Sequence, residues 1–380
     1  MKKIVILIAS AFLLSTTSLA QNIQIDSLRF STEKGLLIFE GYLNGIKTDF
    51  AFDTGAGSGV LTSKSLRSPG ISMQGHRKIN DSQQNVAKLG LAKINSLKIG
   101  AFDFLNITSV LSDMPFLYCN DVYLLGGDVI NQLNWKFDFE KNIVYFSKQP
   151  FAMHAGMQEM PFRIVGNRHF STLLAQGQYI ENVLIDFGFA GFCTLESTSS
   201  KTRQIMRTLS PEGIYPSKSS SMGLNSMSVG KMTNSFFLDS VRLGGLPIND
   251  LKVNAMPDTH DKIGLLLLKR NFKQIIINSL ELKYWLLPNS VLPARQTSFD
   301  ASFHLNDKRQ LEVVSMNGSL KNTAESLKIG QRLIELNGRR GESFANKCEF
   351  LSWYAEQAKN DQFTILTTKG ETLIIGRSIF

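Results

Sequence analysis

The 380-residue chain is longer than one typical domain, so about two or three domains are expected. Its hydrophobic content of 43% and charged content of 19% are typical of a globular protein and exclude a disordered one. The formal net charge of +9 comes from Lys and Arg residues scattered along the chain. Because these residues are not clustered among aromatic side chains, a solvated basic surface is indicated and nucleic-acid binding is not supported.

The first twenty residues are typical of a signal peptide. Lys2 and Lys3 precede the apolar run IVILIASAFLL, and the small residues SLA stand before Gln21. The run is short for a membrane span, and no later segment is long and apolar enough to cross a bilayer. We therefore expect an exported protein, periplasmic or secreted, that is soluble and has no transmembrane segment after residue 20.

The stretch DFAFDTGAGSGVLTS, residues 49–63, ends an apolar strand at Asp53 and continues into a glycine-rich turn. Gly55, Gly57 and Gly59 superficially suggest a dinucleotide loop. However, VLTSKSLRS is a poor helix candidate and no βαβ alternation follows, which excludes a phosphate cradle. A catalytic carboxylate and an ordinary strand-end turn remain the two interpretations.

An internal repeat relates two halves of the chain. INSLKIGAFDFLNI matches LDSVRLGGLPINDL without a gap, and each copy predicts a strand, a glycine turn and a second strand. The repeat pairs Asp53 with Asp186 and Gly55 with Gly188. The matched segments are 94–107 with 238–251, 49–57 with 182–191, 123–130 with 262–269, and 135–146 with 273–285.

Two similar lobes that each contribute one aspartate on a glycine turn can bring the two carboxyl groups together. Carboxyls a few ångströms apart cannot both ionise easily, so they share a proton and one apparent pKa rises. The charged member can take a proton from a water molecule while the neutral member hydrogen-bonds a substrate carbonyl. This is general acid–base hydrolysis of an amide without a covalent intermediate.

The motif FDTGAGSGVL resembles the active-site loop of retropepsin-like aspartic proteases, and YLLGG and KIGLL resemble that family's element of two hydrophobic residues and a glycine beneath the loops. The resemblance covers about residues 35–288. It implies that Asp53 and Asp186 are the catalytic pair, with Asp53 as base and Asp186 as partner acid, although a dyad permits exchange. It also implies that the loops are supported by Thr54, Gly55, Ala56, Phe187 and Gly188.

Phe187 departs from the family pattern, which has Thr or Ser after the aspartate. The missing hydroxyl would hydrogen-bond between the loops, and such a bond contributes roughly 0.5–1.5 kcal/mol. One alternative is therefore a degenerate protease fold that binds peptides without cutting them. A second alternative is a homodimer that pairs two copies of Asp53.

Two hairpins are expected over the cleft of such a protease. Position in the repeat places them at residues 75–90 and in SSSMGLNSMSVGKM, residues 219–232. The overlapping serine-rich segment YPSKSSSMG, residues 215–223, is typical of a mobile loop, either over the cleft or on the surface.

From about Ser298 the repeat stops, and LEVVSMNGSLKNTAESLKIGQRLIELNGRR resembles the central part of a PDZ domain. The resemblance implies a short helix at AESL, a longer helix in FANKCEFLSWYAEQA and a closing hairpin in FTILTTKGETLIIG. A carboxylate-binding loop is expected near SFHLNDKRQ, although that segment contains no clear glycine motif. Peptide binding by strand addition and a packing or dimerisation role are equally open.

The predicted fold is mainly β, with two retropepsin-like β lobes followed by a small α+β PDZ-like domain. The boundaries are residues 1–20 for the signal peptide, 21–150 and 151–296 for the lobes, and 297–380 for the last domain. Cys119, Cys193 and Cys348 permit one disulfide, whose pairing stays open. The five His residues lack metal-ligand spacing, so no metal or cofactor is expected, and the expected partner is an extended polypeptide substrate.

Overall fold

The structure is a computed structural model that describes residues 24–81, 84–224, 227–293, 295, 297–316 and 327–379. The predicted signal peptide and nearly all of the predicted AESL helix lie outside the described residues. The fold is mainly β, as the sequence predicts. None of the described helices is long and apolar enough to span a membrane.

The first repeat is built almost entirely from strands, joined by short turns and two short helices. In chain order it contains β1 (Ile25–Ser31), β2 (Ile38–Leu43), β3 (Ile46–Phe52), β4 (Val60–Leu61), β5 (Ile71–Asn80), β6 (Val86–Ile99), β7 (Phe102–Leu111), α1 (Pro115–Asn120), β8 (Val122–Leu125), α2 (Gly127–Ile130), β9 (Asn134–Asp138) and β10 (Ile143–Ser147).

The second repeat also contains two α-helices, but its first helix, α3, lies before the β16–β17 hairpin, whereas α1 follows the matching hairpin of the first repeat. It contains β11 (Gln158–Pro161), β12 (Arg163–Val165), β13 (Arg168–Ala175), β14 (Gln178–Asp186), β15 (Cys193–Glu196), α3 (Ser200–Arg207), β16 (Tyr215–Met222), β17 (Met227–Leu238), β18 (Val241–Leu243), β19 (Leu246–Ile248), β20 (Leu251–Met256), β21 (Lys262–Gly264), α4 (Leu265–Asn271), β22 (Phe272–Asn278) and β23 (Lys283–Pro288).

Strand registers show that the repeat seen in the sequence is also structural. Tyr42 of β2 pairs with Lys98 of β6, and Leu174 of β13 pairs with Arg242 of β18. The turns that follow carry Gly100 at φ +53° and Gly244 at φ +55°, a conformation that glycine adopts without steric cost.

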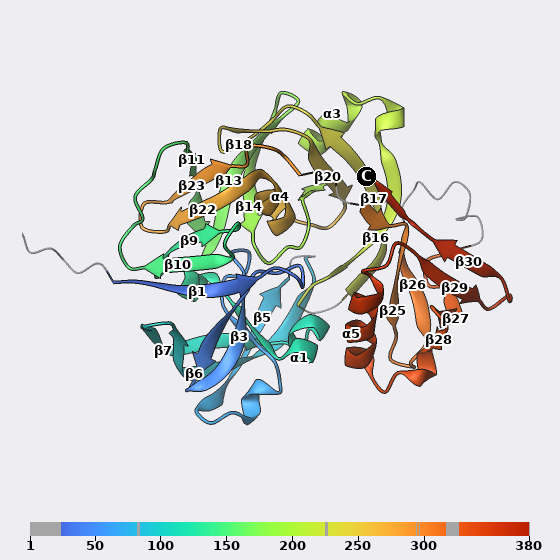
Figure 1. The fold of residues 1–380 in the computed structure, drawn as a ribbon, viewed down its shortest axis with the longest axis horizontal. Coiled ribbons are helices and arrows are strands. Elements are labelled where there is room, and N and C mark those ends of the chain that lie inside the picture. The colour runs from blue at the N-terminus through green and yellow to red at the C-terminus, as the bar shows by residue number, and fades with distance from the viewer. Residues whose placement is uncertain are drawn as a thin grey trace, which may run out of the picture.

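A run of six strands joins the two repeats through their matched ends. The order is β11-β23-β22-β9-β10-β1, and β9 pairs antiparallel with β22 at its centre, with Ile276 opposite Lys136. Figure 1 shows β9 and β10 beside β22 and β23, between the blue and the green parts of the ribbon. The two repeats therefore share a continuous sheet below the loops that follow β3 and β14.

Aromatic side chains fill the core where the repeats meet. Phe52, Trp135, Phe137 and Phe187 are fully buried, and the ring centroids of Phe52 and Trp135 lie 5.0 Å apart in an edge-to-face arrangement. Edge-to-face pairs of this kind stabilise a core beyond the area they bury. The aromatic-rich composition thus supports the region beneath the Asp53 and Asp186 loops.

The C-terminal segment has a hydrophobic core of its own, formed around Phe303, Phe344 and Phe363. The predicted longer helix and closing hairpin are confirmed. SFHLNDKRQ forms strand β25 and the turn that leads into β26, which the Asn306 side chain closes, and its role as a carboxylate-binding loop stays a prediction. The elements are β24 (Thr297–Phe299), β25 (Ala301–Leu305), β26 (Leu311–Met316), β27 (Arg332–Leu336), β28 (Arg339–Arg340), α5 (Lys347–Gln357), β29 (Phe363–Thr367), β30 (Thr372–Ile375) and β31 (Arg377–Ile379).

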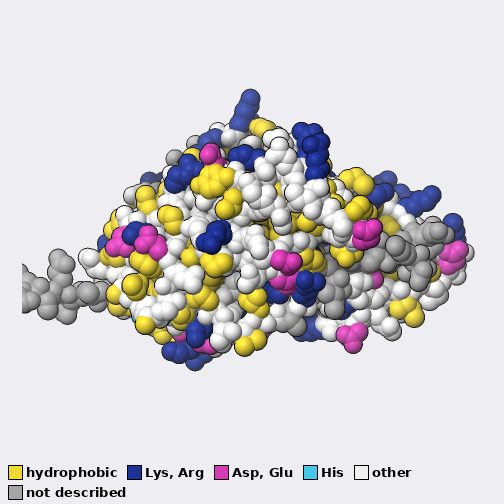
Figure 2. All heavy atoms as spheres, turned by 90° about the horizontal axis from the view of Figure 1, so that it is seen from above, with side chains coloured by type: hydrophobic (Ala, Val, Ile, Leu, Met, Phe, Trp, Pro, Cys, Tyr) yellow, Lys and Arg dark blue, Asp and Glu magenta, His cyan; other side chains and the backbone are white. Residues whose placement is uncertain are grey.

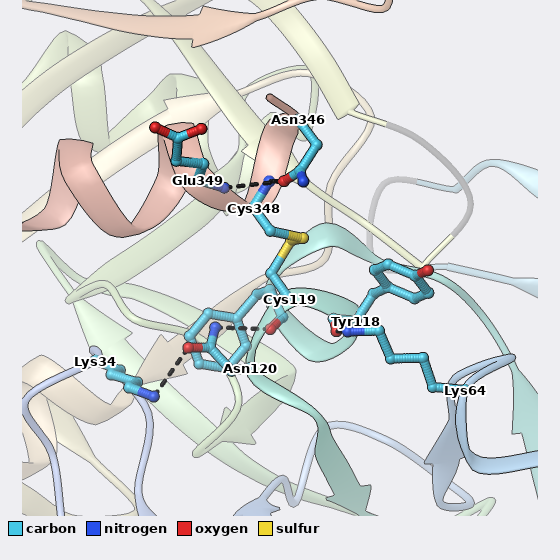
Figure 3. The surroundings of a disulfide bond; sticks show 9 residues. Lys34, Lys64, Tyr118, Cys119, Asn120, Asn346, Cys348 and Glu349 are labelled. Carbon is cyan, nitrogen blue, oxygen red and sulfur yellow. Dashed lines mark hydrogen bonds between the residues drawn. A yellow bond between two sulfur atoms is a disulfide. The ribbon is translucent and has the colours of Figure 1, made fainter. Parts of the chain in front are cut away.

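This segment is attached to both repeats. A disulfide joins Cys119 of α1 to Cys348 of α5, and Figure 3 shows it between the two helices. In addition, Lys218 of β16 pairs with Met316 of β26. Cys193 is a buried free cysteine.

Two details of the sequence analysis need correction. The serine-rich segment expected to be a mobile loop forms strand β16, because it pairs antiparallel with β17 along most of its length. The repeat alignment that paired Tyr123 with Lys262 is also shifted by one residue. Strand pairing places Leu124 beside Ala51 and Lys262 beside Leu184, so Leu124 is the structural equivalent of Lys262.

Candidate active site

The two predicted aspartates meet between the repeats, each packed against the glycine of the opposite loop. A Cβ added to Gly55 would lie 2.5 Å from Cγ of Asp186, and a Cβ added to Gly188 would lie 2.2 Å from Cγ of Asp53. Real Cβ atoms do not approach other atoms this closely, so only glycine fits at either position. The reciprocal contacts bring the two carboxyl groups together within one chain.

The Asp53 carboxylate is held by the main chain of its own loop. Its Oδ1 accepts hydrogen bonds from the amides of Gly55 at 2.7 Å and Ala56 at 3.1 Å. The amide of Asp53 donates to the carbonyl of Leu125 on the neighbouring strand β8 at 3.0 Å. The loop thus fixes the carboxylate at the end of β3, where the sequence predicts it.

Thr54 links the loops through two hydrogen bonds. Its buried hydroxyl donates to the carbonyl of Ile185 at 2.5 Å and accepts from the amide of Phe187 at 3.2 Å. These two residues flank Asp186 in the chain. One side chain from the first loop therefore fixes the main chain on both sides of the second aspartate.

Phe187 replaces the matching hydroxyl with aromatic packing. Its side chain is fully buried, and its ring centroid lies 5.5 Å from that of Phe52 and 5.6 Å from that of Phe137. Phe52 precedes Asp53, so this contact also joins the two loops. The departure from the family pattern changes the kind of contact between the loops without removing it.

Each loop rests on a glycine at the start of a short helix. Gly126 precedes α2 and Gly264 precedes α4, with nearly identical backbone angles. The next amides donate to the loops, from Gly127 to Ala56 at 2.8 Å and from Leu265 to Phe189 at 2.9 Å. The predicted element therefore lies beneath the loops in both repeats. Strand pairing matches Gly126 of the first copy with Gly264 of the second.

Burial raises the pKa of Asp53 well above its usual value, and the adjacent Asp186 carboxyl adds to the effect. The amide donors of Gly55 and Ala56 act in the opposite direction and are outweighed. Asp186 itself is only 6% exposed. Closely spaced buried carboxyls of this kind share a proton instead of ionising together.

Lys262 is a site residue that the sequence analysis did not identify. Its Nζ lies 3.9 Å from Oδ2 of Asp186 and 4.4 Å from the centre of the Phe189 ring. The signal was present as a lysine inside the otherwise apolar strand KIG, but the shifted alignment paired it with a tyrosine. Its structural equivalent in the first repeat is the apolar Leu124.

A second group that the sequence analysis missed lies behind Thr54. The buried imidazole of His169 is hydrogen-bonded to the hydroxyl of Tyr284 and to the side-chain oxygen of Asn131, both at 2.6 Å. Its amide donates to the carbonyl of Thr54 at 3.3 Å. Burial lowers the pKa of His169 to about 3, so the network contains a neutral imidazole at neutral pH.

The carboxylates open into a cleft with one cavity on each side. One of about 320 Å³ is lined by Asp186, Phe189 and Lys262, and another of about 550 Å³ by Asp186, Gly55 and His260. Among the described residues, Asp186 lines both cavities and Asp53 lines neither.

Two hairpins cross the cleft, one from each repeat. The first, β5–β6, lies where the sequence predicts it, and Gln84 at its tip donates to the carbonyl of Thr259 in the second repeat at 3.2 Å. The second, β16–β17, accepts a hydrogen bond from Ser112 of the first repeat at the carbonyl of Leu224, at 2.6 Å. Each hairpin therefore reaches over to the opposite repeat.

The outer surface carries mixed charges. Figure 2 shows Lys and Arg side chains dispersed over the face in view, without a continuous basic patch. The described residues also contain no group of three His, Cys, Asp or Glu side chains arranged to hold a metal ion.

Comparisons with known proteins match the part of the chain that contains the first loop. Residues 39–129 match the family model described as "Aspartyl protease", which supports an aspartyl protease family. No curated protein matches the chain.

Two solved structures are similar over different lengths. A retropepsin-like aspartic protease from Rickettsia conorii is 20% identical, with a TM-score of 0.26, over 33% of this chain and 91% of that chain. Basic 7S globulin from soybean is 10% identical, with a TM-score of 0.45, over 71% of this chain and 98% of that chain.

Proposed function

We propose that the protein is a single-chain aspartic endopeptidase in which two lobes, residues 21–150 and 151–296, each supply one catalytic carboxyl. The observation that carries the proposal is the reciprocal packing of Asp53 on Gly188 and of Asp186 on Gly55. An isolated strand-end aspartate needs no second carboxyl beside it. A shared proton between two buried carboxyls is the arrangement that general acid–base hydrolysis requires.

In the proposed reaction, the charged carboxylate takes a proton from a water molecule that attacks the scissile carbonyl carbon. The protonated carboxyl donates to the carbonyl oxygen, so the tetrahedral intermediate carries no net oxyanion. The carboxyl that received the water proton then donates it to the leaving nitrogen, while a hydroxyl of the intermediate returns its proton to the other carboxylate. The C–N bond breaks, and the pair again holds one shared proton. The two hairpins would cover the substrate and limit the access of bulk water.

The cleft favours an extended polypeptide substrate. The cavities on the two sides of Asp186 have room for side chains before and after a scissile bond. The two hairpins reach over the cleft from opposite repeats, where the Gln84 side chain and the Leu224 carbonyl make hydrogen bonds. An extended backbone can pair with the strand edges of such hairpins.

The pseudo-enzyme alternative rests on Phe187. The contacts of Thr54 on both sides of Asp186 weaken this alternative, because they position the second loop without a hydroxyl at residue 187. The homodimer alternative is weakened because Asp186 already occupies the place beside Asp53 that a second copy of Asp53 would take.

We also propose that the protein is exported, to the periplasm or outside the cell. The basic and apolar residues at the N-terminus support export. The Cys119–Cys348 disulfide also supports it, because such bonds persist in oxidising compartments.

For the PDZ-like segment, residues 297–380, we propose a bracing role, with peptide binding as the second candidate. The disulfide to α1 and the strand contact with β16 favour bracing, because α1 and β16 adjoin the cleft walls. Met222 at the end of β16 and Phe116 of α1 both line the cavity beside Asp186. Peptide binding would use the edge of β25, which pairs with β26 on its other side.

The test is cleavage of an unfolded protein by the purified chain starting at Gln21, from acidic to neutral pH, with fragments identified by mass spectrometry. Asp53→Asn and Asp186→Asn should each abolish cleavage, because either change removes the shared proton. Asp49→Asn is the matched control, since it makes the same chemical change at an exposed position of the same strand β3.

The outcomes separate the alternatives. Cleavage that survives Asp186→Asn but not Asp53→Asn would favour the homodimer, which the mass in solution would then reveal. A folded wild-type chain that cuts nothing at any pH would refute the endopeptidase, and peptide binding by that chain would support the degenerate fold.

A further inference from the structure

We propose that Lys262 is a positioning residue that keeps Asp186 charged, so that Asp186 acts as the general base of the dyad and Asp53 as the proton donor. The inference rests on the proposed function and assigns its two roles. It reverses the roles expected from the sequence, where Asp53 was the base. It also makes the two halves of the site chemically unequal despite the repeat.

The contact between Lys262 and Asp186 is well placed for this role. Nζ and Oδ2 are 3.9 Å apart, and the two side chains are only 11% and 9% exposed. Attraction between opposite charges is much stronger at a site with little solvent than on the surface. The Phe189 ring at 4.4 Å from Nζ further stabilises the ammonium through a cation–π contact.

The surroundings of Asp53 suit the opposite protonation state. Its Oδ1 already accepts two main-chain amides, which leaves Oδ2 to carry a proton. Burial and the neighbouring Asp186 raise the pKa of Asp53 despite those amides. A proton on Oδ2 of Asp53 would therefore be donated toward the charged Asp186.

The position of Lys262 in the repeat makes the asymmetry specific. The equivalent position in the first repeat is Leu124, so no matching ammonium is placed beside Asp53 from β8. Asp186 also lines the cavities on both sides of the dyad, where a water molecule and a scissile bond would lie. The lysine-paired carboxylate is thus the one that lines the space where the attacking water would lie.

Other charged groups near Asp186 do not replace this effect. His260 faces it, but burial together with Arg168 and Lys262 lowers the pKa of His260, which leaves it neutral at neutral pH. Lys34 and Asp258 line one cavity, while Arg77, Lys78, Asp81 and Arg168 line the other. The ion pair of Asp186 is with Lys262.

The expected effect is a shift of the pH profile. A cation beside a carboxyl pair favours its ionised form and so lowers the apparent pKa of the acidic limb. An opposite charge at this range typically moves a carboxyl pKa by about one to three units. Replacing Lys262 by an apolar residue should therefore move the acidic limb of kcat/KM upward by about one unit or more.

The experiment compares the pH profiles of wild type, Lys262→Met and Lys262→Arg. Arg keeps the charge and should keep the acidic limb near its wild-type position. Lys283→Met is a matched control, because Lys283 also pairs with a carboxylate, Glu159 at 3.0 Å, and lies 5.6 Å from an aromatic ring, that of Trp285, but is on β23 and outside the cleft. A folded Lys262→Met variant with an unshifted profile would overturn the inference.

A second measurement does not depend on turnover. Carboxyl ¹³C titration by NMR of wild type and Lys262→Met should show the lower apparent pKa of the pair rising by about one unit or more in the variant. An unchanged titration would overturn the inference, including for a variant that is folded but inactive. If wild type cuts nothing, the proposed protease function fails, while this titration still decides whether Lys262 controls the charge of Asp186.

Discussion

Restoring the family's hydroxyl in the second loop, by Phe187→Thr, should harm this protein. Phe187 is fully buried with ring centroids 5.5 and 5.6 Å from those of Phe52 and Phe137. Truncating a buried Phe to Ala typically costs about 3–5 kcal/mol. A new hydroxyl that found a partner across the loops would return only about 0.5–1.5 kcal/mol.

The net effect expected for Phe187→Thr is therefore a loss of about 2–4 kcal/mol in the free energy of unfolding. A loss of this size should lower the midpoint of thermal unfolding by roughly 5–10 °C. We also expect lower cleavage activity than wild type at the same temperature, because the second loop would lose packing next to Asp186.

Thermal and urea unfolding measure the stability, and cleavage of an unfolded protein measures activity. Phe187→Leu is the control, since it keeps most of the apolar volume without adding a hydroxyl and should lose less stability. A Phe187→Thr variant that is as stable as wild type and more active would refute the reasoning. It would mean that a hydroxyl hydrogen bond between the loops stabilises the site more than the aromatic packing of Phe187 does.

Three further predictions concern stability and pH. Thr54→Val should lower the free energy of unfolding by about 2–4 kcal/mol, because the hydrogen bonds to Ile185 and Phe187 are lost and buried main-chain groups stay unpaired. The same change should reduce kcat more than it changes KM. Thr54→Ser keeps the hydroxyl and should stay near wild type in denaturant unfolding and kinetics. Reducing the Cys119–Cys348 disulfide, which closes a separation of 229 residues, should destabilise the chain by up to about 5 kcal/mol in denaturant titrations, and an unchanged midpoint would count against it. Burial lowers the pKa of His169 to about 3 in the folded chain, so the imidazole of the unfolded chain binds a proton first as pH falls. Between about pH 6.5 and 3, this difference should remove about 1.4 kcal/mol of stability per pH unit. In unfolding measured against pH, His169→Asn should flatten that slope.

The local patterns in the sequence predicted much of the fold. Alternating apolar residues and glycine turns depend only on residues close together in the sequence. The strands around Gly100 and Gly244 and the hairpin at residues 75–90 could therefore be predicted. The serine-rich segment was misjudged because its polar composition resembles a loop. Pairing with β17 supplies the backbone hydrogen bonds that its composition does not indicate.

The candidate site was predictable only where the repeat preserved its motif. Asp53 and Asp186 were matched through the glycine two positions after each. Those glycines are required because each packs against the carboxyl group of the other repeat. Lys262 was missed because the two repeat copies were aligned one residue out of register. Such a shift becomes visible only when the pairing partner of each strand is known. His169 and Tyr284 escaped because they are 115 residues apart in sequence.

The sequence by itself determined which chemistry the chain can offer: two carboxyls on glycine turns, apolar strands to carry them, and cysteines able to form one disulfide. Only the tertiary structure decided which groups surround each carboxyl. It placed two amides on Asp53, an ammonium beside Asp186 and an aromatic ring where a hydroxyl was expected. Charges and burial act through space over a few ångströms, and these distances arise from strand pairing between segments far apart in the chain.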